Sequence, residues 1–147
     1  MKKLIYFLVF VMCLGYVKAQ DAEITDDDLK AYALSNAAVK SITSSISPMV
    51  NDLISKQEGM TGQRFKELQA TDGDANKLAN IEAQEWEITF LNTVNAEIDK
   101  RKDAAKELIN IMANYAIGSS TYKAIRSGLN SDADLKARYA TIEAKFE

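Results

Sequence analysis

The stretch 75–117 constrains the fold more than any other part of this chain, because it contains neither glycine nor proline. Its apolar residues recur at the three- and four-residue steps that keep one face of an α-helix against a partner. That seam consists of Ile81, Ile88, Leu91, Ile98, Ala105, Ile109, Met112 and Ala116. As one helix the stretch would be about 65 Å long, at 1.5 Å per residue. The absence of turn residues predicts a continuous helix, and the polar run 99–103 is the alternative place for a break.

A second long helix is predicted to begin at Thr25, a residue type that caps helix N-termini. The acidic triplet 26–28 follows it and suits the first turn of a helix, while a calcium site is the alternative interpretation. Helical spacing then joins Val39, Ile42, Ile46, Met49 and Leu53. Pro48 interrupts this seam without changing its phase, which predicts a kink. The alternative is a new helix capped by Ser47 with Pro48 in its first turn.

Shorter helices are predicted around these two. Thr61 would cap a helix over 63–70, and the turn 71–74 would break and recap the chain. Gly118 would end the long helix, with a short helix from Ser119 or Ser120 and a last one capped by Ser131. The predicted fold is all-α: a bundle of two long antiparallel helices, the first kinked at Pro48, closed by two or three short helices. Its expected core contains Ile42, Ile46, Leu53, Phe65, Leu68, Ile81, Ile88, Leu91 and Ile109.

The first nineteen residues predict a secretory signal peptide. Lys2 and Lys3 precede an apolar run over 4–17, and Val17 and Ala19 occupy the positions that a signal peptidase reads. Cleavage after Ala19 would leave one domain, 20–147, in the periplasm of a bacterium or outside the cell. The run of about fourteen residues is shorter than the roughly 20 that span a bilayer, which argues against a stable anchor. A retained helix and a lipid on Cys13 are the alternatives.

The processed chain would carry fifteen basic and twenty-one acidic residues, a net charge of −6. This balance argues against nucleic acids and anionic membranes as partners, since both bind through cationic contacts. The chain has no histidine, and its only cysteine lies in the predicted signal peptide. Most metal, haem and iron–sulfur sites and the His-based catalytic triads are thereby excluded. We expect no cofactor and no enzymatic activity; paired carboxylates are the remaining catalytic option.

One calcium-loop pattern is incomplete. Asp72, Asp74 and Asn76 match the first three ligands of an EF-hand. Lys77 and Ala83 stand where that loop needs a glycine and a bidentate glutamate, so helix capping is the better interpretation.

Trp86 and Phe90, one helical turn apart, are the predicted binding residues. Such a pair is ordinarily part of a core, and a stacking platform for a sugar or another ring is the alternative. Asn95 and Lys102 are polar positions within the seam, where they either face water or set helix register and oligomeric state. The basic run 100–102 predicts a solvated surface or a patch for an anionic partner.

The C-terminal part carries Tyr122 and Ile125 and then Asp132, Leu135 and Arg138, in the pattern Y-x-x-I and D-x-x-L-x-x-R. Together with the opening TDDDLKAYA over 25–33, this pattern resembles a family of small secreted bacterial helical proteins, the domain of unknown function four-one-six-eight. The resemblance implies an all-helical extracytoplasmic protein. It also implies that Tyr122, Ile125, Leu135 and Arg138 hold the short C-terminal helices against the long pair. The activity of that family is unassigned.

The predicted function is therefore protein–protein interaction or a structural role, because long helical seams bind other helices or self-associate. An unidentified protein or a second copy of the chain would be the partner. The alternative is a carrier of a small ligand or lipid, with an apolar cavity lined by Trp86, Phe90, Met49 and Met112.

Overall fold

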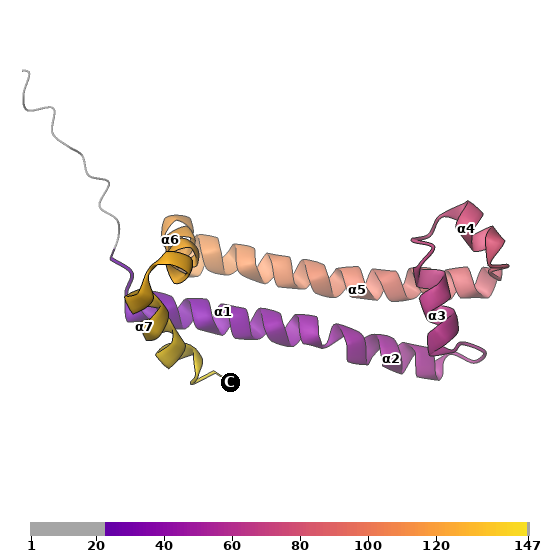
Figure 1. Ribbon diagram of the computed structural model, residues 1–147, viewed down its shortest axis with the longest axis horizontal. Coiled ribbons are helices and arrows are strands. Elements are labelled where there is room, and N and C mark those ends of the chain that lie inside the picture. The colour runs from indigo at the N-terminus through magenta and orange to yellow at the C-terminus, as the bar shows by residue number, and fades with distance from the viewer. Residues whose placement is uncertain (1–22, 147) are drawn as a thin grey trace, which may run out of the picture.

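The computed structural model describes residues 23–146, which form an all-α bundle without a β-strand (Figure 1). One rod of the bundle is α1 followed by α2, and α5 returns antiparallel beside it (Figure 1). Short helices close the two ends, which confirms the predicted architecture. The helices are α1 (Asp26–Ser44), α2 (Ile46–Lys56), α3 (Gly62–Gln69), α4 (Ala75–Asn80), α5 (Glu85–Ile111), the π-helical turn η1 (Met112–Ala116), α6 (Ser119–Ser131) and α7 (Ala133–Glu143).

The first rod begins and bends where the sequence predicts. The Thr25 hydroxyl accepts a hydrogen bond from the Asp28 backbone N–H, and the Asp28 carboxylate accepts one from the Thr25 backbone N–H, which is a capping box. The bend lies at Ser45. Pro48 has no N–H to offer the Ser44 carbonyl four residues earlier, and its ring crowds that carbonyl. The helix therefore restarts as α2 with Pro48 in its first turn, and Ser45 rather than Ser47 is the residue at the boundary.

The prediction of one helix over 75–117 is wrong at its N-terminal end. α4 stops at Asn80, and α5 begins only at Glu85. Glu82 takes a left-handed conformation, with φ of 52°. The N–H groups of Glu82 and Ala83 then bond back to the carbonyls of Ala79 and Leu78, both at 3.0 Å. This is a Schellman motif with glutamate in the position that glycine usually takes, so the break carries no glycine signal.

The remainder of that stretch is continuous. α5 runs through the polar run 99–103 without a break and ends in η1, where the Ile117 N–H bonds to the Met112 carbonyl five residues earlier. Gly118, with φ of 91°, ends the rod as predicted.

The short helix α6 begins at Ser119, as predicted, but the last helix is capped one residue later than expected. The Asp132 carboxylate, and not Ser131, accepts hydrogen bonds from the N–H groups of Asp134 and Leu135 at the start of α7. A carboxylate is the stronger cap for a helix N-terminus because it also carries the charge that the helix dipole favours.

The core is divided into two clusters at opposite ends of the bundle. One joins the start of α1 to α6 and α7 and contains Leu29, Tyr32, Ala33, Ile117, Ile125, Leu135, Tyr139 and Ile142. The other joins α3 and α4 to the start of α5 and contains Met60, Phe65, Leu68, Leu78, Phe90, Leu91 and Val94. The two clusters share no buried residue. We name the first the terminal cluster and the second the α3–α5 cluster.

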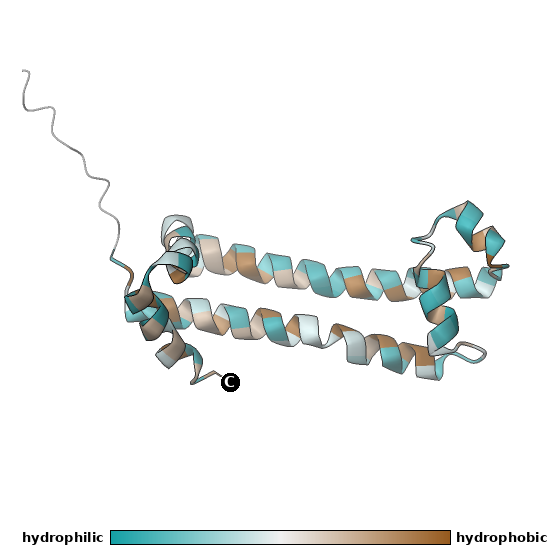
Figure 2. Ribbon diagram, viewed as in Figure 1, coloured by the Kyte–Doolittle hydropathy of each residue, from teal (hydrophilic) through white to brown (hydrophobic). Residues whose placement is uncertain are grey.

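The expected core is therefore correct only in part. Phe65, Leu68 and Leu91 are buried. Half-buried instead are Ile42, Ile46, Leu53, Ile81, Ile88 and Ile109. Leu53, Ile81 and Ile88 lie at the margin of the α3–α5 cluster. In the middle of the bundle, at Ile42 and Ile46, the two rods of residues 23–146 face only each other, so no third helix completes the burial of their seams. Figure 2 shows hydrophobic and hydrophilic residues alternating along both rods in this region.

The predicted signal peptide, 1–19, lies outside the described residues. Within residues 23–146, no helix has the length and apolar character needed to cross a bilayer.

Candidate functional site

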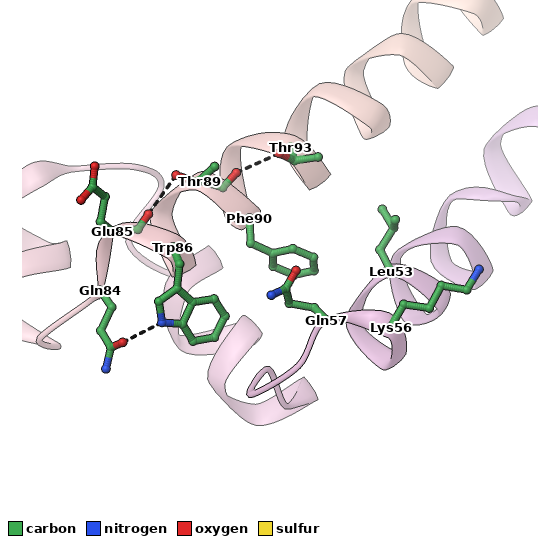
Figure 3. Close-up of a pocket in the computed structure, with 9 residues that line it drawn as sticks. All are labelled: Leu53, Lys56, Gln57, Gln84, Glu85, Trp86, Thr89, Phe90 and Thr93. Carbon is green, nitrogen blue, oxygen red and sulfur yellow. Dashed lines mark hydrogen bonds between the residues drawn. The ribbon is translucent and has the colours of Figure 1, made fainter.

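The predicted binding residues Trp86 and Phe90 come together in a groove between α2 and α5 (Figure 3). The groove has a volume of about 880 Å³ and is open to solvent. Its lining consists of Leu53, Lys56, Gln57, Gln84, Glu85, Trp86, Thr89, Phe90 and Thr93. The first three belong to the end of α2 and its C-cap, and the others to the start of α5 and its N-cap.

Trp86 stands at the edge of this groove and keeps 37% of its surface exposed. Its indole N–H donates a hydrogen bond of 2.6 Å to the side-chain oxygen of Gln84. Its ring lies against the turn at Gly59, where an added Cβ would approach the ring to 3.5 Å. The indole is thus fixed at one edge and presents an apolar surface to the groove.

Phe90 forms the floor of the groove and also belongs to the α3–α5 cluster. Only 8% of it is exposed, and its ring meets that of Phe65 edge-on, with centroids 5.9 Å apart. Of the two sequence interpretations, the core one therefore describes Phe90. Trp86 is left as the accessible aromatic surface.

The polar groups around the groove are already partnered. The Thr89 hydroxyl donates to the Glu85 carbonyl and the Thr93 hydroxyl to the Thr89 carbonyl, each at 2.9 Å (Figure 3). Lys56 pairs with Asp52 at 2.7 Å. The groove therefore presents aromatic rings and threonine methyl groups, with the charged side chains of Lys56 and Glu85 exposed around them, which suits a ligand that contributes apolar side chains.

An ion pair that sequence reasoning missed positions the start of α5. The Arg64 guanidinium donates to both carboxylate oxygens of Glu87, at 2.7 and 2.8 Å, and to the Ile81 carbonyl at 3.1 Å. The Gln84 N–H donates to Glu87 as well, at 2.9 Å. The bonds from Arg64 hold the pKa of Glu87 below its ordinary value, even though burial acts to raise it. The sequence contains one local signal for this arrangement, because Glu87 stands three residues after the N-cap Gln84, as in a capping box. No residue near Glu87 in the sequence indicates that Arg64 binds it.

The residues of the family-like pattern lie at the opposite end and act in packing and capping. Ile125 and Leu135 are buried in the terminal cluster, and Asp132 caps α7. The Tyr122 ring packs against that of Tyr32, with centroids 5.2 Å apart.

Arg138 links the last helix to the first. It donates to the Asp26 carboxylate at 2.7 Å and to the Ile24 carbonyl at 3.1 Å. This hydrogen bond lowers the pKa of Asp26. Both residues are exposed, so the pair contributes more to orientation than to stability.

A smaller crevice of about 320 Å³ lies between α1 and the end of α7. Its lining consists of Ala33, Asn36, Ala37, Lys40, Ser41, Ser44, Glu143 and Phe146. Beside it, Asn36 donates to the Tyr139 hydroxyl at 3.1 Å, and that hydroxyl donates to Glu143 at 2.9 Å. Burial raises the pKa of Tyr139 to about 12. This network fastens α7 to α1.

The other predicted residues do not gather at either crevice. Asn95 is half-buried and Lys102 is exposed, paired with Asp99 at 3.6 Å. Arg101 pairs with Glu97 at 2.9 Å. Met49 and Met112, which the carrier hypothesis groups with Trp86, are not among the residues that line the groove.

Scanning family models and searching the curated proteins and the solved structures gave no match to this chain.

Proposed function

We propose that this chain is an exported, non-enzymatic protein that acts by protein–protein association, and that the groove between α2 and α5 receives an amphipathic helix. The observation that carries this proposal is the position of Trp86, a partly exposed indole above the buried ring of Phe90 in an open groove. Helix-in-groove recognition uses such a surface, because a partner helix inserts apolar side chains at three- and four-residue spacing. Tryptophan is also the residue type that most often dominates binding energy at interfaces.

The electrostatics of the site support binding rather than bond-making. Among residues 23–146, Glu87 is the one charged residue that is buried. Its carboxylate already accepts hydrogen bonds from Arg64 and from the Gln84 N–H. The charged residues that line the groove, Lys56 and Glu85, are exposed. The export predicted from residues 1–19 would place this surface outside the cytoplasm, where its partner would then be found.

The experiment replaces Trp86 with a photo-cross-linking amino acid that itself has an aromatic side chain, so that a ring is kept at this position, in cells that express the full chain. We expect light-dependent adducts at position 86 and only background at Lys77, which is exposed on α4 outside the groove. Thr93→Glu should reduce the adducts by about tenfold or more, because a carboxylate on the groove wall must be desolvated when a partner docks.

Thr141→Glu is the matched control. Thr141 is also an exposed helical threonine whose hydroxyl donates to a carbonyl four residues earlier, but it lies on α7. Adducts that form equally at position 77, or that Thr93→Glu leaves unchanged, would overturn the proposal.

A further inference from the structure

One stripe along α5 and η1 carries large apolar side chains near both ends and an ion pair at its centre. Its apolar and neutral members are Trp86, Phe90, Thr93, Leu108, Ile111 and Tyr115. Glu97 and Arg101 continue the same three- and four-residue spacing between the two groups. Residues at this spacing share one face of a helix.

Apart from Phe90, which is 8% exposed and belongs to the core, this stripe lies beside the buried face of α5. Ala105 is buried against the neighbouring rod, whereas Ala104, which continues the spacing of the stripe between Arg101 and Leu108, is exposed. Consecutive helical residues point about 100° apart. At the C-terminal end Ile111 is 43% and Tyr115 84% exposed, the highest value among the exposed large hydrophobic residues. The fold thus leaves two large apolar side chains, one helical turn apart, in water at this end.

The stripe is symmetric about the point between Lys100 and Arg101. Trp86 and Tyr115 are equally far from this point, and so are Phe90 and Ile111. Two antiparallel copies related by a two-fold axis there would pair each end of one stripe with the opposite end of the other. We infer that a second copy of this chain covers the stripe in this arrangement. The inference rests on the proposed function and names its partner.

The shapes of the two ends fit this pairing. One end is the groove with Trp86 at its edge, and the other projects Tyr115 into solvent. In the antiparallel pair Tyr115 of each copy enters the groove of the other beside Trp86, where two aromatic rings stack or meet edge-on. Because the same surfaces are used twice, the assembly closes as a dimer and leaves no free end for further growth.

The charges at the centre fit it too. Glu97 and Arg101 of each copy lie near the axis, so each Arg101 would stand between its own Glu97, 2.9 Å away, and the Glu97 of the other copy. A shift in register would move these charges against apolar surface, so they specify one alignment. The stripe is about 44 Å long, so the pairing would run along the whole of α5 and η1.

Light scattering of the purified protein tests the stoichiometry. We expect twice the chain mass, and Tyr115→Glu should move the dimer to monomer at a concentration where the unchanged protein is dimeric. The dissociation constant should rise about tenfold or more, as for loss of an aromatic anchor. Phe146→Glu is the control, because Phe146 is an exposed aromatic residue outside the stripe. A monomer at all concentrations, or equal effects of both variants, would overturn the inference.

Single cysteines in a Cys13→Ser background test the alignment, since the chain then contains no other thiol. Arg101→Cys should form an intermolecular disulfide under mild oxidation, because position 101 lies almost on the axis and disulfides need Cα atoms about 6 Å apart. Tyr115→Cys alone should not form one, but mixed with Trp86→Cys it should give the heterodimer. A disulfide between two copies of Tyr115→Cys would indicate parallel packing and refute the alignment.

The two proposals fail separately. A monomeric protein that still forms adducts at position 86, sensitive to Thr93→Glu, would retain the proposed function and exclude the second copy as partner. Adducts that consist of two chains of this protein would support both proposals. A monomer without adducts would refute both.

Discussion

Leu29 and Leu34 lie on the same helix, α1, but in opposite environments. Leu29 is fully buried in the terminal cluster, whereas Leu34 is 54% exposed. Leu29→Ala removes three buried carbon atoms, worth about 2.4 kcal/mol of transfer free energy at about 0.8 kcal/mol each. The cavity that remains adds to this cost, and leucine-to-alanine changes in cores cost about 2–5 kcal/mol in total. We expect Leu29→Ala to lower the free energy of unfolding by about 3 kcal/mol.

Leu34→Ala is the matched control, with the same chemical change in the same helix. It should cost less than about 0.5 kcal/mol, as surface substitutions usually do. Urea unfolding followed by circular dichroism at a helical wavelength measures both changes, on protein concentrations below the dimer range. A cost under about 1 kcal/mol for Leu29→Ala, or similar costs for the two variants, would refute the burial argument for the terminal cluster.

Four further results are expected. Glu82→Gly should raise the free energy of unfolding by about 0.5–1 kcal/mol in a thermal melt, because glycine takes the left-handed position without strain. Gly128→Ala should lower it by about 1–3 kcal/mol, since its Cβ would lie 2.6 Å from Leu135 Cδ2. The pKa of Glu87 is lowered in the fold, so its stabilisation is present above about pH 4.3 and is lost as the pH falls through the folded value. Glu87→Gln should therefore be less stable at neutral pH and lose less in acid, measured by urea titrations across pH. Tyr139, with its pKa raised to about 12, keeps its proton in the fold after the unfolded phenol ionises near pH 10. Stability should fall by up to about 1.4 kcal/mol per pH unit between these values, and Tyr139→Phe should reduce that slope.

Three helix starts could be predicted because their signals are local. Thr25, Thr61 and Asp74 each cap the helix that follows them, as the sequence indicates. A cap needs only a side-chain oxygen and an N–H two or three residues later, so a short stretch of sequence contains all of it.

The break between α4 and α5 could not be predicted, because its local signal is unusual and the residue that bridges it is distant in the sequence. Arg64 lies on α3, bonds to the carbonyl of Ile81 and holds Glu87, so it connects the end of one helix to the start of the next. The local sequence has a glutamate at the left-handed position, where pattern reasoning looks for glycine.

The extent to which these residues are buried could not be predicted from the sequence either. Helical spacing identifies the face that Ile42, Ile46 and Ile109 present, and all three lie half-buried where the rods meet. Spacing does not say how many helices will cover that face. The groove was likewise predicted only as a pair, Trp86 and Phe90, since its opposite wall comes from α2.

The division of the core has a consequence for local unfolding of this molecule. Each end has its own set of interior contacts, and only a pair of helices connects them. We therefore expect the two ends to open as separate cooperative units, so that a substitution at one end leaves amide exchange at the other unchanged. A ligand that reshapes the groove would then do so without disturbing the distant C-terminal helices.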